Sequence, residues 1–377
     1  MTRPFPRFLG FCARRPKTCI VVLHFALVGL TLLRLRCSYP SLEQIILYNG
    51  WDDGKTFFDI AARGYRALPS YEYRELFGYP LAARLFFLFL GPSPYALALV
   101  SFLSSLLANL VILAILRSWN LSAGEALGGT VFFMTCRTPE SIMSIFGGWP
   151  LPPMEHLVAI EGSEPLFLLL VLLAYLPMER GKHLSSALLL AAATLVRPHG
   201  SFIAFGAFIY LFLKKDWKAL FYCLSPMVVA LHFAYYYWIR GDFFAFCVAA
   251  REYYPDGVVF AYPFRDLVRN LHALSVGALP VGLVVSRVVF QVFFLYGFVL
   301  LFRRKRLLFW LMLPHYLVNV SMCDWSHHVR YYVVLWGISV VWYLTILDGF
   351  RAAVRTGDRR VGQPQLCRRE SSDNGQS

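Results

Sequence analysis

The sequence predicts an all-α, polytopic membrane protein with about ten transmembrane helices, and both its composition and its apolar runs support that prediction. Hydrophobic residues make up 58% of the 377 positions and charged residues only 15%, whereas a soluble domain carries about 25% charged residues. This composition excludes a disordered chain, because disorder requires low hydrophobicity and dense charge. It also argues against a soluble nucleic-acid binder, despite a net charge of +14, since the basic residues interrupt apolar runs.

The apolar runs give the predicted spans. Crossing a bilayer takes about 20 mostly apolar residues, or fewer where neighbouring helices bury the ends. In chain order the predicted spans are 18–35, 93–116, 126–146, 163–178, 184–197, 200–213, 217–239, 276–302, 307–321 and 330–348. The apolar stretch 81–91 ends at Gly91-Pro92, which predicts a re-entrant or interfacial helix. No small-residue cleavage site follows the first apolar run, so we expect a retained span and not a signal peptide.

The distribution of charge predicts the orientation, since cytoplasmic segments of membrane proteins carry an excess of Lys and Arg. With both termini cytoplasmic, that side holds the whole net charge of +14, and the remaining bases and acids balance. Residues 1–350 then form a single transmembrane domain with two long outer loops, 36–84 and 240–275. The polar, charged residues 351–377 predict a disordered cytoplasmic tail.

Two carboxylates in the first outer loop are the catalytic candidates. Asp52 and Asp53 follow Trp51 and precede residues 57–61, whose apolar spacing is typical of an amphipathic helix at the membrane interface. Such a helix would hold both carboxylates at the level of the lipid headgroups, where a lipid phosphate arrives. The alternative is a pair of ordinary solvated loop carboxylates.

Polar residues at the outer ends of later spans are candidates for substrate binding, because ionisable groups at membrane depth usually line a polar cavity. Glu164 opens the span 163–178, where an acid either caps the helix or belongs to the site. Arg197 either snorkels at the interface or grips a phosphate with its forked guanidinium. The other substrate-binding candidates are Trp51, His199, Arg251 and Arg330.

Several motifs are absent from the sequence. The eight cysteines form no CxxC pair, and there is no Walker A loop and no GxGxxG. We therefore expect no metal and no cofactor.

Six segments, in the same order along the chain, resemble the GPI mannosyltransferase 2 family. Asp53 to Tyr65 is similar to the family segment Trp-Asp-x6-Ile-Ala-x2-Gly-Tyr. The other similar segments are Tyr71-Glu72 with Phe77–Pro80, Ser163–Phe167, Leu195–Gly200, Gly241–Phe246 and Arg330–Tyr332, of which the last two resemble prokaryotic relatives. Asp52 stands where the family has Trp, and His199 where its GPI enzymes have Asn, so the chain resembles the prokaryotic-type branch more closely.

The resemblance implies the C-type glycosyltransferase (GT-C) fold. Such enzymes take a sugar from a polyprenyl (dolichyl) phosphate on the non-cytoplasmic face, and an acidic residue of the first outer loop serves as the base. Asp53 is then the expected base, with Asp52 in reserve. Arg197 is the first candidate for the donor phosphate, followed by Arg330 and Arg251, and Glu164 positions Arg197 or a sugar hydroxyl.

The implied reaction transfers mannose, or a similar sugar, to a lipid-linked glycan or a glycoprotein. A lipid monophosphate leaving group lacks the diphosphate that usually recruits a metal. The expected partners are membrane lipids, the donor and the acceptor, with no nucleic acid. The expected location is the endoplasmic reticulum membrane in a eukaryote and the cell membrane in a prokaryote. The alternative function is a transporter or flippase of a lipid-linked anionic substrate.

Overall fold

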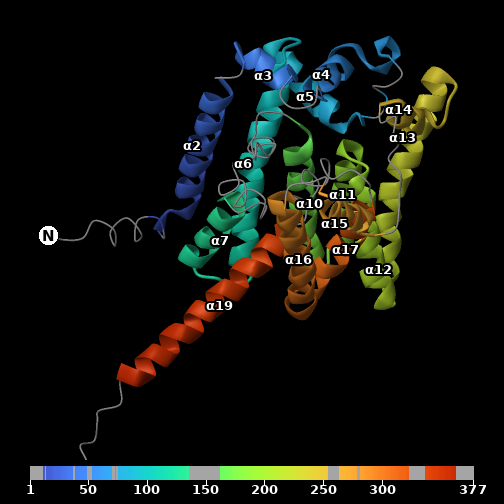
Figure 1. Ribbon diagram of the computed structural model, residues 1–377. Helices are drawn as coiled ribbons and strands as arrows, with labels where there is room; N and C mark the ends of the chain where they lie inside the picture. Colours follow the sequence, from blue (N-terminus) through green and yellow to red (C-terminus); the bar gives the residue numbers. More distant parts are fainter. Residues whose placement is uncertain are drawn as a thin grey trace, which may run out of the picture.

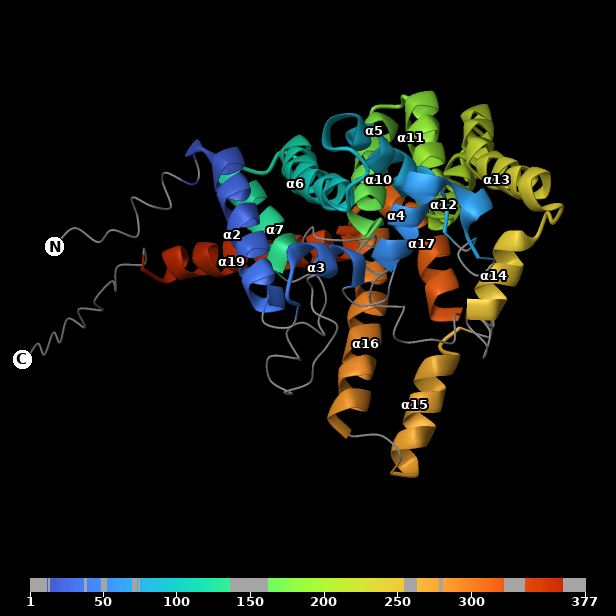
Figure 2. The same cartoon turned by 90° about the horizontal axis from the view of Figure 1, so that it is seen from above.

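All regular elements in the described part of the chain are helices, as the sequence predicts (Figure 1). The computed structural model describes residues 12, 14–36, 39–48, 53–69, 73, 75–135, 162–253, 263–277, 281–321 and 336–361. Seen from above, α15 (Arg265–Ser275) and α16 (Val281–Arg304) lie side by side and extend away from the remaining helices (Figure 2).

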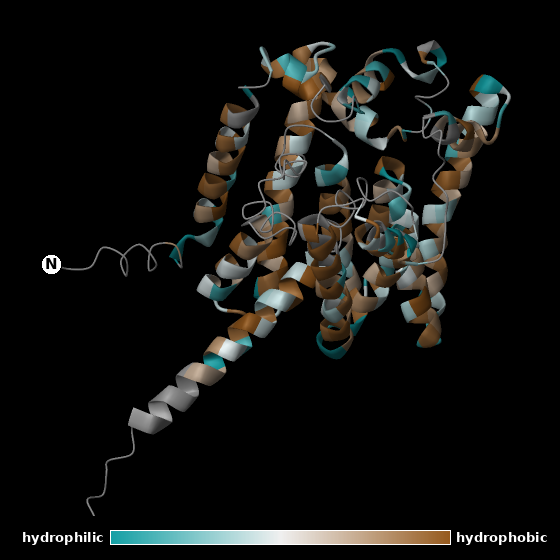
Figure 3. Ribbon diagram, viewed as in Figure 1, coloured by the Kyte–Doolittle hydropathy of each residue, from teal (hydrophilic) through white to brown (hydrophobic). Residues whose placement is uncertain are grey.

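Five helices begin and end close to predicted spans. They are α2 (Pro16–Arg36), α6 (Tyr95–Ser118), α10 (Glu164–Glu179), α11 (His183–Val196) and α12 (His199–Leu213). Apolar residues cover most of their length and polar residues gather at their ends (Figure 3). The apolar runs therefore predict where these helices lie.

The later spans agree less closely with the helices. α16 and α17 (Arg306–Ser321) match two predicted runs, and α7 (Ala123–Thr135) covers the first part of 126–146, of which the rest lies outside the described residues. The run 217–239 is not one α-helix, because it begins as the 3₁₀ helix η3 (Trp217–Cys223) before α13 (Leu224–Arg240). Pro226 explains the break, since it has no N–H for the carbonyl of Tyr222 and its ring would clash with that carbonyl.

Three helical stretches of the described residues are long and apolar enough to cross a membrane: Pro16–Leu33, Tyr95–Ser118 and Trp217–Arg240. They indicate a membrane protein. α11 and α12 are apolar but have only 14 and 15 residues. The number of spans, ten, stays a prediction.

One end of the bundle gathers side chains that the charge distribution assigns to the cytoplasm. Trp119 donates its indole N–H to Glu179 at 2.9 Å, and the Lys305 ammonium lies 3.9 Å from the centre of the Trp119 ring. Arg351 forms an ion pair with Glu125, with Nη2 and Oε1 2.5 Å apart. Residues of one predicted side thus lie together at one end of the molecule; they come from α7, α10 and α19 and from the residues that follow α6 and α16.

The C-terminal helix is longer than expected. α19 (Trp336–Val361) continues past the predicted span end at 348 and projects from the bundle (Figure 1). Residues 351–361 are helical in the structure, and the disordered tail from Arg351 onward stays a prediction. Pairing of Arg351 with Glu125 and with Asp348, one turn earlier, stabilises the helix at this point.

The opposite end of the bundle carries a layer of short helices from the first predicted outer loop. They are α3 (Leu42–Tyr48), α4 (Asp53–Arg63), η1 (Tyr65–Ala67) and α5 (Gly78–Leu90) (Figure 1). α4 buries Phe57, Ile60 and Ala61 and exposes Lys55 and Arg63, which is the amphipathic pattern that the sequence predicts. α5 is the helix expected at 81–91. In the second predicted outer loop, α14 (Ala245–Tyr253) follows α13.

Candidate functional site

The turn between α11 and α12 fixes the position of Arg197. Arg197 precedes Pro198, and a residue before proline is driven out of the α region. Its backbone is extended, with φ −146° and ψ 137°, so α11 ends there. Gly200 makes the turn tight, because a Cβ at that position would lie 2.6 Å from the backbone nitrogen of Thr194.

Arg197 is held by two side chains from the start of α10. Its Nε donates to Ser163 Oγ at 2.7 Å, and its Nη2 donates to Glu164 Oε1 at 2.6 Å. The exposed fractions of the Arg197 and Glu164 side chains are 10% and 2%. The structure thus places Glu164 against Arg197. It also explains why Ser163, the N-cap residue of α10, makes no side-chain capping bond.

A second chain of hydrogen bonds reaches the same point from α5. The Tyr79 hydroxyl lies 2.9 Å from the carbonyl oxygen of Leu97, to which it donates, and 2.7 Å from Ser101 Oγ. Ser101 Oγ in turn donates to the carbonyl oxygen of Gly162 at 2.9 Å. Because Gly162 directly precedes Ser163, this chain fixes the segment that holds Arg197.

Asp53 is the first residue of α4 and is partly buried. A helix N-terminus stabilises a carboxylate through the helix dipole. The next residue, Gly54, lies against the carbonyl of Ile46 in α3 and leaves no room for a Cβ. One turn later, Phe57 packs edge-on against Tyr79, with ring centres 4.9 Å apart. The helix that carries Asp53 is therefore anchored on the tyrosine that leads to Arg197.

Among the remaining predicted site residues, His199 has a described side chain, and it lies outside this group. His199 is buried inside the bundle, with its ring centre 5.2 Å from that of His315 in α17. Arg251 lies on α14. Trp51, Asp52 and Arg330 lie outside the described residues.

A cleft of about 500 Å³ opens beside this group, and sequence reasoning missed it. It lies between α4, η1, α5, α11 and α13. The lining residues are Ile60, Ala61, Gly64, Tyr65, Phe77, Pro80, Leu81, Arg84, Leu195, Val228, Leu231, His232 and Tyr235. Arg84 is exposed and is the only Lys or Arg among them. The one available sequence signal was His232, a titratable residue within an apolar run.

Tyrosines fix the rim of the cleft. Tyr65 donates its hydroxyl to the carbonyl of Glu75 at 2.6 Å, and Tyr236 donates to the carbonyl of Tyr73 at 2.7 Å. Arg240, at the end of α13, donates to the Tyr73 hydroxyl. Burial, followed by the neighbouring Tyr236, raises the pKa of Tyr65 well above its usual value, so its hydroxyl keeps its proton.

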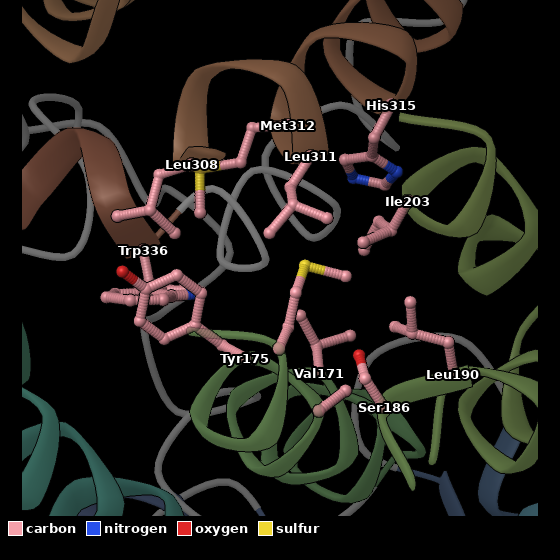
Figure 4. A pocket seen from close by; sticks show the side chains of 12 residues that line it. Val171, Tyr175, Ser186, Leu190, Ile203, Leu308, Leu311, Met312, His315 and Trp336 are labelled. Atoms are coloured by element: carbon pink, nitrogen blue, oxygen red, sulfur yellow. The ribbon is translucent and has the colours of Figure 1, made fainter. Parts of the chain in front are cut away.

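A second cavity, of only about 10 Å³, lies inside the bundle between α10, α11, α12, α17 and α19 (Figure 4). Val171, Ile203, Leu311 and Met312 form its apolar wall, and Ser186 lies at its edge (Figure 4). This volume corresponds to about one water molecule. The cavity is therefore too small for a substrate.

Within the described ranges, no group of three or more His, Cys, Asp or Glu side chains is placed to hold a metal ion. Comparison of the chain with protein-family models, with curated proteins and with solved structures gives no match.

Proposed function

We propose that the protein is a glycosyltransferase that moves mannose, or a similar sugar, from a polyprenyl phosphate to an acceptor hydroxyl on the non-cytoplasmic face of a membrane. One observation carries the proposal. The helix of Asp53 and the buried Arg197–Glu164 pair are joined through Tyr79 at the same end of the bundle as the apolar cleft. The helix that begins at Asp53 also lines the apolar cleft, through Ile60 and Ala61, and this arrangement suits a reaction between a hydroxyl and a lipid-linked sugar.

In the proposed reaction, Asp53 accepts the proton of the acceptor hydroxyl while the hydroxyl oxygen attacks the anomeric carbon. The bond from that carbon to the phosphate oxygen breaks, and polyprenyl phosphate leaves with the electron pair. A positioned base contributes about 10²- to 10⁴-fold to such a step. A single displacement inverts the anomeric centre, so a β-linked donor gives an α-linked product.

The leaving phosphate needs a positive partner. Glu164 already compensates the charge of Arg197, and the pair is buried. This argues for Arg197 as the residue that fixes the local structure, and for the exposed Arg84 at the cleft as the cation that meets the phosphate.

The test is transfer of label from polyprenyl-phosphate [³H]mannose by the purified protein in detergent. Asp53→Asn should lower turnover by 10²-fold or more. Asp59→Asn is the matched control, because Asp59 lies on the same helix and, among the described residues, forms an ion pair with the exposed Arg63 at 3.8 Å. Wild-type turnover in Asp53→Asn would refute the base assignment, and loss only in Asp52→Asn would move it by one residue. Label that crosses the membrane without being transferred would identify a transporter.

A further inference from the structure

His232 is a buried polar side chain that the proposed reaction has not used. It lies on α13, lines the cleft, and is only 2% exposed. Both ring nitrogens are buried and make no hydrogen bond to any described residue. Leaving a buried donor or acceptor unsatisfied costs about 1–3 kcal/mol. This cost indicates that the imidazole has a partner that the described residues do not supply.

The ring is held firmly by aromatic neighbours. Phe77 stacks on it with ring centres 5.0 Å apart at 27°, and Tyr236 packs against it edge-on at 4.3 Å. This packing orients the imidazole, whose hydrogen-bonding atoms lie on the ring edge. A neutral imidazole offers one donor and one acceptor, so a bound oxygen could satisfy it.

The walls of the cleft determine which ligands fit. Apart from Arg84, His232 and the two tyrosines Tyr65 and Tyr235, the lining side chains are apolar, and the Tyr65 hydroxyl is already bonded to a backbone carbonyl. A lone water needs two to four polar partners and would find few here. A cleft of about 500 Å³ lies within the range of small-ligand sites, which are mostly apolar with a few placed polar groups.

We propose that this cleft binds the phosphate end of a polyprenyl phosphate, with His232 donating a hydrogen bond to a phosphate oxygen. The exposed Arg84 supplies the opposite charge, and Leu81, Leu195 and Leu231 contact the first isoprene units. The proposal rests on the proposed function for the identity of the lipid. It adds a binding residue, His232, that no sequence motif marks.

Binding is tested apart from turnover. Farnesyl phosphate, a short and soluble polyprenyl phosphate, is titrated into the purified full-length protein in detergent, and intrinsic tryptophan fluorescence is followed. Farnesol and inorganic phosphate serve as separate probes of the chain and of the charge. The wild type should bind farnesyl phosphate at least 10-fold more tightly than either probe.

His232→Phe keeps an aromatic ring between Phe77 and Tyr236 and removes both nitrogens. It should weaken farnesyl phosphate binding by 10-fold or more and leave farnesol binding unchanged, because a hydrogen bond to a charged group contributes about 1.5–3 kcal/mol. His272→Phe, at an exposed histidine of α15, is the matched control and should bind like the wild type. Arg84→Gln, a surface substitution that should not disturb folding, should weaken the same binding.

Two results would overturn the proposal: unchanged affinity in His232→Phe, or a wild type that binds farnesol as tightly as farnesyl phosphate. Failure of the proposed function is recognised separately. If farnesyl phosphate binds as expected but no mannose is transferred, the lipid-phosphate site stands and the transferase assignment falls. If mannose is transferred while both variants bind normally, the transferase stands and this site is wrong.

Discussion

The buried ion pair between Arg197 and Glu164 gives the most direct test of the site, because the chain contains a matched pair at its surface. Both pairs join an arginine to a glutamate, with Nη2 and Oε1 2.6 Å apart in the site and 2.5 Å apart between Arg351 and Glu125. They differ in burial. The arginine and glutamate side chains are 10% and 2% exposed in the site, but 43% and 25% exposed at the surface.

Removing one partner of a buried pair leaves an uncompensated charge, which costs about 3–5 kcal/mol. Exposed pairs contribute about 0–1 kcal/mol. Glu164→Gln should therefore lower the free energy of unfolding by about 3–5 kcal/mol, and Glu125→Gln by less than about 1 kcal/mol. The free energy is measured by SDS titration of the purified protein, followed by circular dichroism.

The double variant Glu164→Gln/Arg197→Gln distinguishes the cost of an unpaired buried charge from independent costs at the two positions. If the penalty comes from an unpaired buried charge, removing both charges should cost clearly less than the sum of the two single changes. Equal costs for Glu164→Gln and Glu125→Gln, or additive costs in the double variant, would refute the reasoning. A functional Arg197 in direct contact with substrate would instead lower turnover with little change in stability.

Three further predictions follow from local geometry. Gly78→Ala should destabilise the protein by about 1–3 kcal/mol in the SDS titration, because the new Cβ would lie 2.5 Å from the carbonyl carbon of Leu195. Gly29→Ala in α2 is the control and should be neutral or stabilising, since a Cβ at that position meets nothing within 4 Å. Tyr79→Phe keeps the ring packing and removes one hydroxyl. It should lower the free energy of unfolding by about 1–3 kcal/mol and also lower the turnover of mannose transfer. Unchanged turnover would contradict a link between Tyr79 and the site. Hydrogen bonds from Ser122, followed by that of Arg351, lower the pKa of the Glu125 carboxyl below its usual 4.5. The stability that the ionised carboxylate contributes should be complete above pH 4.5 and be lost as the pH falls through the lower pKa of the folded state. In thermal unfolding, the melting temperature of Glu125→Gln should therefore fall less on acidification than that of the wild type.

The sequence predicts the helices well because their physical cause is local. Apolar runs of the right length give α2 and α6 within a few residues, and the spacing of Phe57, Ile60 and Ala61 gives the buried face of α4. Helix breaks are also local. Pro226 carries the local signal for the 3₁₀ start of the run 217–239, because it has no N–H to donate.

The site is harder to predict because its parts come from distant segments. Glu164 is equally suited to capping α10, and only the fold brings Arg197, 33 residues away, to its carboxylate. The cleft requires five helical elements at once, and no spacing along the chain brings His232 to Phe77. Exposure of Arg84, and burial of Arg197, are likewise properties of the packed bundle and not of the residue type.

The segment Phe77–Tyr79 connects the separate parts of the proposed site. Phe77 stacks on His232 in the cleft, Gly78 lies against the backbone at the end of α11, and Tyr79 contacts the helix of Asp53. Three consecutive residues thus fix the cleft, the segment before Arg197 and the helix of Asp53 relative to one another. A proton acceptor and a phosphate site must keep a fixed separation for an in-line displacement, since a misplacement of about 1 Å can cost 10²-fold in rate. A substitution in this segment should therefore affect donor binding and turnover together, whereas a change at Asp53 should lower turnover and leave donor binding unchanged.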